Sequence, residues 1–284
     1  MLYGFSMDDV GYPGYSTPEH LENVLKMLEK NQLKGTFFVV PKVELKEYRT
    51  LLQEAVAAGH EIGQHGLTHY RFEVGIPPMM VLNAPHEKEY KEYLAVHRAE
   101  IESKLTVENI RKTLREGRNI LEDFMQLPIR GFRAPCLQLS EALFEALALE
   151  GYQYDSSTWL QPYNWAGSGL TEPVKITRAD FEEKQKPGLL ELPLTADYVW
   201  NLPRERYQAR MELALYDFRN IRQAGFPLVN LSHVSPIQTP DGTGLRFIAE
   251  WTAKMKAEDP DFRSLTLSSI AAQPGIRNPN ENTK

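Results

Sequence analysis

The chain has 284 residues, 42% of them hydrophobic, and this is enough to bury a large core in one domain. Its formal net charge of −6 argues against nucleic acid as a partner, and its single cysteine, Cys136, excludes an intrachain disulfide framework. The longest apolar runs are too short for a membrane span, and no signal peptide is visible, which leaves the compartment open but favours the cytoplasm over secretion.

Short apolar segments alternate with amphipathic helical segments from one end of the chain to the other. The first helix is expected to start at a capping box formed by Ser16 and Glu19, and Ser140 and Gly151 are expected to bound a later one. The eight expected strands are residues 2–7, 36–40, 61–64, 131–134, 153–156, 189–194, 228–231 and 264–267.

Strands that alternate with helices predict a parallel sheet, and about eight such units indicate a closed or nearly closed (β/α) barrel. The alternative is an open doubly wound sheet, but no G-x-G-x-x-G follows an early strand, so a dinucleotide site is not supported. We expect one α/β domain over residues 1–284 with long insertions at about 70–105 and 160–187. The first insertion includes a charged helical segment over 86–104, and residues from about 273 to 284 are expected to be a disordered tail.

Polar residues gather where the expected strands end. They are Asp8, Asp9, His65, His69, Arg133, Asp155 and His233. Each has a structural explanation when taken alone, such as a polar turn, a surface histidine, an ion pair, a helix cap or a buried core histidine. Because the ends of parallel barrel strands share one rim, where the active sites of such barrels lie, their joint placement instead predicts an active site.

Two of these residues, His65 and His69, are spaced like neighbours one helical turn apart and could bind one ion together. A carboxylate from another strand end would complete a site that keeps open positions for water and substrate, as catalytic metal sites do. Nitrogen and oxygen ligands suit zinc, and also cobalt, nickel or iron. Asp8 and Asp9 can both serve this site only where the strand breaks, and Gly11 and Pro13 indicate that the break is close by.

At this point the sequence resembles the NodB-homology polysaccharide deacetylases, carbohydrate esterase family 4, whose fold is a distorted (β/α) barrel. Five short motifs carry the resemblance. They are Ser6-Met7-Asp8-Asp9, the stretch from Gly59 to His69, Phe132-Arg133-Ala134-Pro135, Asp155-Ser156-Ser157-Thr158-Trp159 and Leu231-Ser232-His233.

The resemblance implies a hydrolase of non-peptide C–N bonds with one divalent metal ion, most simply zinc. Its metal ligands would be Asp9, His65 and His69. The catalytic residues would be Asp8 as base, His233 as acid, Arg133 orienting Asp8, and Asp155 orienting His233. The substrate-binding residues would be Pro135, Cys136, whose backbone N–H would stabilise the oxyanion, and Trp159 and Leu231, which would wall the acetyl pocket.

Several residues depart from the family pattern and leave the substrate open. Gly66 replaces a hydroxyl residue and is expected to loosen its loop, and Cys136 and Leu137 stand where tyrosine and glycine are common. Val10 follows the aspartate pair where the family usually has glycine, and Val234 follows His233 where aspartate is common. The implied reaction removes N-acetyl or related acyl groups from an amino-sugar polysaccharide or oligosaccharide.

Two other functions fit the same barrel. One is an allantoinase-like or formamidase-like hydrolase of a small amide or ureide, and the other is an inactive carbohydrate-binding relative. Tyr163, Trp165, Tyr198 and Trp200 could be sugar-stacking platforms or ordinary loop and core aromatics. The expected partner is therefore a carbohydrate or small N-acyl substrate, and a homo-oligomer stays open.

Overall fold

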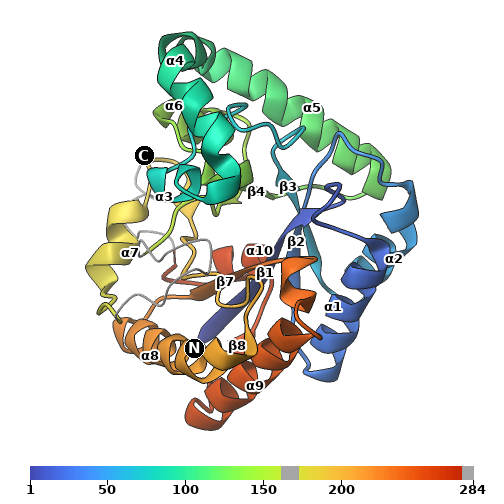
Figure 1. Cartoon of the computed structure of the whole chain (residues 1–284), viewed down its shortest axis with the longest axis vertical. Coiled ribbons are helices and arrows are strands. Elements are labelled where there is room, and N and C mark those ends of the chain that lie inside the picture. The colour runs from blue at the N-terminus through green and yellow to red at the C-terminus, as the bar shows by residue number, and fades with distance from the viewer. Residues whose placement is uncertain (161–172, 277–284) are drawn as a thin grey trace.

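The computed structural model describes residues 1–160 and 173–276. Its strands form one parallel sheet in the order β6-β5-β4-β3-β2-β1-β7, and β8 pairs with β1 beside this path. The strands are β1 (Leu2–Val10), β2 (Gly35–Val39), β3 (Glu61–His65), β4 (Gly131–Arg133), β5 (Tyr154–Asp155), β6 (Leu190–Glu191), β7 (Leu228–His233) and β8 (Arg263–Ser264). The sheet is curled, and helices surround it (Figure 1). This confirms the predicted distorted (β/α) barrel.

The barrel is not closed by a regular strand pair between β6 and β7. Instead, the segment that follows β6 crosses to β7, where Thr195 donates its N–H to Val229 O (2.9 Å) and Leu231 donates to Ala196 O (3.2 Å). The crossing matters for the site, because it carries the residues after Ala196 to the rim beside the end of β7.

Most of the helices surround the sheet, whereas α10 (Leu267–Ala271) lies inside the ring and packs against the inner face of the strands (Figure 1). The helices are α1 (Pro18–Lys30), α2 (Arg49–Ala57), α3 (Met79–Leu82), α4 (Lys88–Lys104), α5 (Val107–Met125), α6 (Glu141–Leu149), α7 (Arg178–Lys184), α8 (Tyr207–Ala224), α9 (Thr243–Glu258) and α10. α1 begins one residue later than predicted, because Thr17 rather than Ser16 is its N-cap and Pro18 occupies the first turn. The central strand β1 is buried over Tyr3–Val10, as expected when both faces of a parallel sheet are covered.

The first insertion is an ordered structure with a small core of its own. It contains α3, a 3₁₀ turn η2 (Pro85–Glu87) and α4, so the predicted helix over 86–104 is confirmed. Its core residues Phe72, Leu82, Leu94 and Ile101 are all buried. In the second insertion, residues 161–172 lie outside the described part of the chain, and the remainder includes α7, which starts at a capping box on Thr177.

At the C-terminal end the structure differs from two expectations. The strand expected at 264–267 is only Arg263–Ser264, because α10 already starts at Leu267. Residues 273–276 do not belong to a disordered tail, since Ile276 packs into a core cluster with an exposed fraction of 8%. Residues 277–284 lie outside the described residues. In the part of the chain that the structure describes, no helix is long and apolar enough to cross a membrane.

Candidate metal and catalytic site

A bulge at the end of β1 turns both aspartates of the first motif toward the barrel mouth. The register with β2 shifts between Met7 and Val10, and Asp9 adopts a left-handed conformation with φ 62°. A residue in this conformation breaks the alternation of a strand, so neighbouring side chains can share one face. The sequence predicted such a break near Gly11, and the structure places it at Asp9 within the strand.

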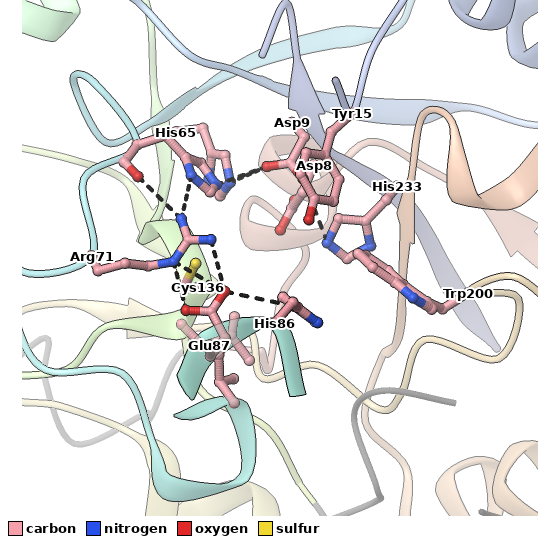
Figure 2. Close-up of a pocket in the computed structure, with 13 residues that line it drawn as sticks. Asp8, Asp9, Tyr15, His65, Arg71, His86, Glu87, Cys136, Trp200 and His233 are labelled. Carbon is pink, nitrogen blue, oxygen red and sulfur yellow. Dashed lines mark hydrogen bonds and ion pairs between the residues drawn. The ribbon is translucent and has the colours of Figure 1, made fainter. Parts of the chain in front are cut away.

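Asp9, His65 and His69 come together as a buried group that could hold a metal ion, with their ligand atoms within 4.8 Å of one another. The Asp9 Oδ1 atom lies 3.3 Å from His65 Nε2 and 2.8 Å from His69 Nε2 (Figure 2). Ligands of a tetrahedral zinc ion with bonds near 2.05 Å are separated by roughly 3.3 Å. The structure therefore brings the three expected ligands to near-coordination spacing.

The hydrogen bonding of His65 supports a cation between these groups. His65 Nδ1 lies 3.0 Å from the carbonyl oxygen of Arg133, which can only accept, so Nδ1 carries a proton. In the neutral imidazole the Nε2 lone pair then faces Asp9 Oδ1, an atom that is buried without a well-aligned hydrogen bond to any described residue. A divalent cation would remove this repulsion, and the carbonyl contact is the support that metal-bound histidines usually have. The donor set therefore fits the metal that the sequence implies.

His69 is not on a helix, contrary to the spacing argument. His65 is the last residue of β3, and His69 lies in the following loop with a left-handed φ of 67°. Its Nδ1 atom is 3.1 Å from Arg71 Nη1, and its ring stacks on Tyr12 at 4.2 Å. A guanidinium only donates hydrogen bonds, and a neutral histidine that binds a metal through Nε2 carries its proton on Nδ1. Two donors would then face each other, so a bound cation would alter the contact between Arg71 and His69.

Gly66 tightens this loop, and the expected loosening is wrong. The residue has a left-handed φ of 60°, and a Cβ atom there would lie 2.0 Å from Glu73 Oε1 and 2.5 Å from Pro135 Cγ. The space is occupied because the Glu73 carboxylate accepts hydrogen bonds from the backbone N–H groups of Leu67 (2.9 Å) and Thr68 (3.0 Å). Glycine therefore allows a carboxylate to brace the loop that carries His69.

Asp8 is held by Arg133 on the floor of the site. Arg133 Nη1 donates to Asp8 Oδ1 at 2.7 Å and to Ser6 Oγ at 2.8 Å, while its other nitrogens donate to Ser156. The guanidinium is fully buried and lies 4.2 Å above the ring of Phe38. This fixed pair is the arrangement expected from the third motif.

Asp197, not Asp155, is the carboxylate bonded to His233. His233 Nδ1 lies 2.8 Å from Asp197 Oδ2, and Asp197 Oδ1 accepts from the backbone of Val199. Asp155 instead accepts from Ser157 Oγ at 2.7 Å and pairs with the carboxyl group of Glu191 on the adjacent strand. Asp197 escaped the sequence reasoning although it lies three residues beyond the expected sixth strand, where the same rule about polar residues at strand ends would have found it.

The pocket in front of these groups has different walls from those expected. Among the residues that the structure describes, Tyr15, Cys136, Leu137 and Trp200 line the pocket. The expected residues Pro135, Trp159 and Leu231 do not. Leu231 is fully buried in the core, and Trp159 lines a separate surface pocket beside Phe144.

The aromatic residues that the sequence proposed as sugar platforms are divided by the structure. Trp200 lies against His233 with ring centroids 4.4 Å apart, whereas Tyr198 is a core residue bonded to Asp217. Tyr163 and Trp165 lie outside the described residues.

Backbone strain is concentrated around this pocket. Four of the eight non-glycine residues with positive φ in the described chain line it: Asp9, His69, Cys136 and Leu137. Each such residue costs roughly 1–3 kcal/mol, and clustering of this kind is typical of functional sites.

The electrostatics of the site favour a protonated His233, the expected acid, and an ionised Asp9, the expected metal ligand. Burial alone would lower the pKa of His233, but its hydrogen bond to Asp197 and the nearby Asp9 raise it above the usual value. Burial alone would raise the pKa of Asp9, yet His69, His65 and His233 hold it well below its usual range. Burial raises the pKa of the Cys136 thiol, which argues against a cysteine nucleophile.

Comparisons with known proteins agree with this geometry. A family model described as polysaccharide deacetylase matches residues 6–154, more than half of the chain. A peptidoglycan-N-acetylglucosamine deacetylase from Bacillus cereus is 25% identical over 175 residues, which cover 61% of this chain and 64% of that protein. The chain therefore matches less than two thirds of this relative's length.

Solved structures show the same fold. A Mycobacterium smegmatis protein assigned to the polysaccharide deacetylases has a TM-score of 0.60 at 18% identity, with 95% of this chain and 88% of that one covered. A family 4 acetyl xylan esterase from Clostridium thermocellum, in complex with a cobalt ion, has a TM-score of 0.53 at 18% identity, covering 95% and 90%. A family 4 pseudoenzyme from Bacillus anthracis has a TM-score of 0.52 at 14% identity, covering 95% and 65%.

Proposed function

Because the chain belongs to the polysaccharide deacetylase family, we propose that it is a metal-dependent hydrolase that removes N-acetyl or related acyl groups from an amino sugar. One observation carries the proposal. A carboxylate fixed by a buried arginine, Asp8, lies next to the three-donor group of Asp9, His65 and His69. The imidazole of His233 lies beside the same group, 4.0 Å from Asp9 Oδ2.

Asp9, His65 and His69 would hold the metal. A divalent cation bound there supplies a Lewis acid that polarises the acyl carbonyl and acidifies water. The chain's own residues then divide the proton transfers. Asp8 accepts a proton from the attacking water, and Arg133 holds this carboxylate in place through a contact of 2.7 Å.

On the other side of the pocket, His233 donates a proton to the leaving amine. Its Nδ1–H is held by Asp197, which keeps Nε2 directed into the pocket beside Asp9. The backbone N–H of Cys136, in the left-handed turn directly after β4, would donate to the oxyanion. One such donor lowers the barrier by about 3 kcal/mol in comparable sites.

A loss of activity, as in the pseudoenzyme with a similar fold, is the competing interpretation. It would require a missing ligand, base or acid. In this chain the carboxylate pair, both ligand histidines and the acid histidine are present and buried at the same barrel mouth. This supports an active enzyme over an inactive carbohydrate-binding relative.

The test combines metal analysis with acetate release from N-acetylglucosamine and its oligomers. We expect close to one equivalent of zinc or cobalt after reconstitution. Asp8→Asn should lower kcat by about 10²–10⁴-fold while metal content is retained. Asp123→Asn, at an exposed position on α5, is the matched control and should behave as wild type. Less than a tenth of an equivalent of metal, or substantial activity in Asp8→Asn, would contradict the proposal.

A further inference from the structure

Part of the first insertion forms one wall of the candidate site. We call residues 79–87, which contain α3 and η2, the cap. Its residues Val81, His86 and Glu87 line the pocket, and Glu87 lies on the opposite side from Trp200 (Figure 2). Val81 is 3% exposed and Glu87 only 1%, so both pack firmly into the protein at this wall, while His86 reaches the solvent.

A buried ion pair joins the cap to the floor of the site. The guanidinium of Arg71 donates from Nε to Glu87 Oε2 at 2.9 Å and from Nη2 to Glu87 Oε1 at 2.7 Å. Its remaining nitrogen, Nη1, reaches His69 Nδ1. Arg71 is 8% exposed, and a two-point contact of this kind fixes orientation as well as distance. The two bonds to Glu87, which do not depend on the His69 contact that a bound cation would alter, therefore set the position of the cap beside the candidate metal site.

The cap is also supported from behind. Leu82 is 1% exposed and packs with Phe72, Leu94 and Ile101 in the small core of the insertion. Ile76 and Leu139 exchange two backbone hydrogen bonds of 3.1 Å, which tie the start of the insertion to the segment after β4. With its own core, a backbone bridge and an ion pair, the cap is a fixed wall.

The facing wall is aromatic. Tyr12 stacks on His69, Tyr15 lies 6.0 Å from Tyr12, and Trp200 lies 6.1 Å from Tyr15 and against His233. These three half-buried rings follow one another from His69 to His233, and Tyr15 and Trp200 line the pocket. Aromatic faces suit the apolar face of a sugar ring, while the exposed imidazole of His86 on the cap suits its hydroxyl groups.

The space between the two walls is limited. The cavity in front of the site is narrow, with a volume of about 40 Å³. This is well below the roughly 300–1,000 Å³ of typical small-molecule sites. When an internal residue of a polysaccharide occupies a pocket, the chain must leave the pocket on both sides. The cap closes one of the sides through which an open groove would let the chain pass.

We infer that the cap restricts the substrate to a compact N-acyl compound, namely a single amino sugar or the terminal residue of a chain, and excludes internal residues of a long polysaccharide. The inference rests on the proposed function, since it concerns the substrate of the same site. The cap is then a specificity-determining element, and the Arg71–Glu87 pair is its positioning device.

The first experiment measures acetate release from N-acetylglucosamine, its oligomers of two to six units and glycol chitin, with mass spectrometry to locate each free amine. We expect kcat/KM to fall at least tenfold from the monosaccharide to the polymer, and oligomers to lose acetyl only from a terminal residue. Equal or faster reaction at internal residues would overturn the inference and leave the proposed function standing.

A parallel assay of formamides and a cyclic ureide separates the two proposals. Turnover of these compounds without turnover of any sugar would support the compact pocket and contradict the amino-sugar proposal. If no N-acyl compound of any size reacts with the metal-loaded protein, the proposed function fails and the inference fails with it.

The second experiment loosens the cap without replacing a metal ligand, and Leu82→Ala does so at a position outside the Arg71–Glu87 ion pair. Glu87→Gln weakens the ion pair, and Leu82→Ala removes a buried side chain from behind the cap. In both variants we expect the ratio of kcat/KM for the tetrasaccharide to that for the monosaccharide to rise at least fivefold. Val96→Ser, at a residue 78% exposed on α4, is the control and should leave this ratio unchanged. An unchanged ratio in both cap variants would overturn the inference, because a general loss of folded protein lowers both rates equally.

Discussion

Replacement of Gly66 by alanine tests how the loop that carries His69 is held. Gly66 and Gly151 both have left-handed backbones, with φ of 60° and 73°, but a Cβ at Gly151 would meet nothing within 4 Å. Gly151→Ala is therefore a matched control for the conformational cost alone, which is about 1–2 kcal/mol for a left-handed alanine.

At position 66 a second cost is added. The new Cβ would lie 2.0 Å from Glu73 Oε1 and 2.5 Å from the ring of Pro135, so the Glu73 carboxylate must move. It then loses its hydrogen bonds to the N–H groups of Leu67 and Thr68. At about 1 kcal/mol each for these partly exposed bonds, with a further contribution from the proline contact, Gly66→Ala should destabilise the fold by about 3–5 kcal/mol.

Urea unfolding followed by circular dichroism measures both variants against wild type. Isothermal titration with zinc is the second assay, because His69 lies three residues from the substituted position. We expect zinc affinity to fall at least tenfold in Gly66→Ala, corresponding to about 1.4 kcal/mol, and to stay at the wild-type value in Gly151→Ala. Agreement of the two variants within about 0.5 kcal/mol, together with equal zinc affinity, would refute the steric argument.

Three further predictions concern buried ionisable groups. Asp197→Asn should lower kcat about 10²–10⁴-fold with an unchanged circular dichroism spectrum, because it removes the anion that orients His233; a kcat within threefold of wild type would count against this role. Burial raises the pKa of both Glu191 and its partner Asp155, so the contribution of this pair to stability is largest below the ordinary carboxyl pKa and is lost as pH rises through the raised values. Glu191→Gln should therefore flatten the dependence of urea midpoints on pH between 5 and 8, and a parallel curve would contradict it. Burial lowers the pKa of His60 from 6.5 to about 4. As pH falls from 6.5 to about 4, the free energy of unfolding of the wild type should therefore fall by up to about 2 kcal/mol, after allowance for partial solvent screening. The free energy of unfolding of His60→Asn, measured in the same way, should fall by less.

The sequence located the site because its chemistry follows the strand ends. Asp8, Asp9, His65, Arg133 and His233 each lie at or beside the end of a strand, and parallel strands bring those ends to one rim. Alternating apolar and amphipathic segments likewise predicted the order of elements around the barrel, because periodicity reports which face of each element is buried.

The sequence failed where irregular backbone sets the geometry. Asp197 carries the strand-end signal, but it lies beyond β6 in an irregular segment that reaches β7 through isolated hydrogen bonds, and the family resemblance favoured Asp155 in its place. The spacing of His65 and His69 suits a helix, but a loop with a left-handed residue also brings the two rings together. The sequence predicted that Gly66 loosens its loop, because glycine is flexible. In the structure the space beside Gly66 is filled by the carboxylate of Glu73, and local sequence patterns do not predict a contact across a loop.

The left-handed residues that line the pocket have an evolutionary consequence. At Cys136, with φ of 52°, glycine would adopt the same backbone with less strain, whereas at Leu137 the same change would also remove a buried core side chain. Random variation screened only for thermal resistance would therefore favour glycine at Cys136, and this change would replace a side chain that lines the pocket. Directed evolution of a hardier enzyme should hold these positions fixed and seek its gains on the outer helices.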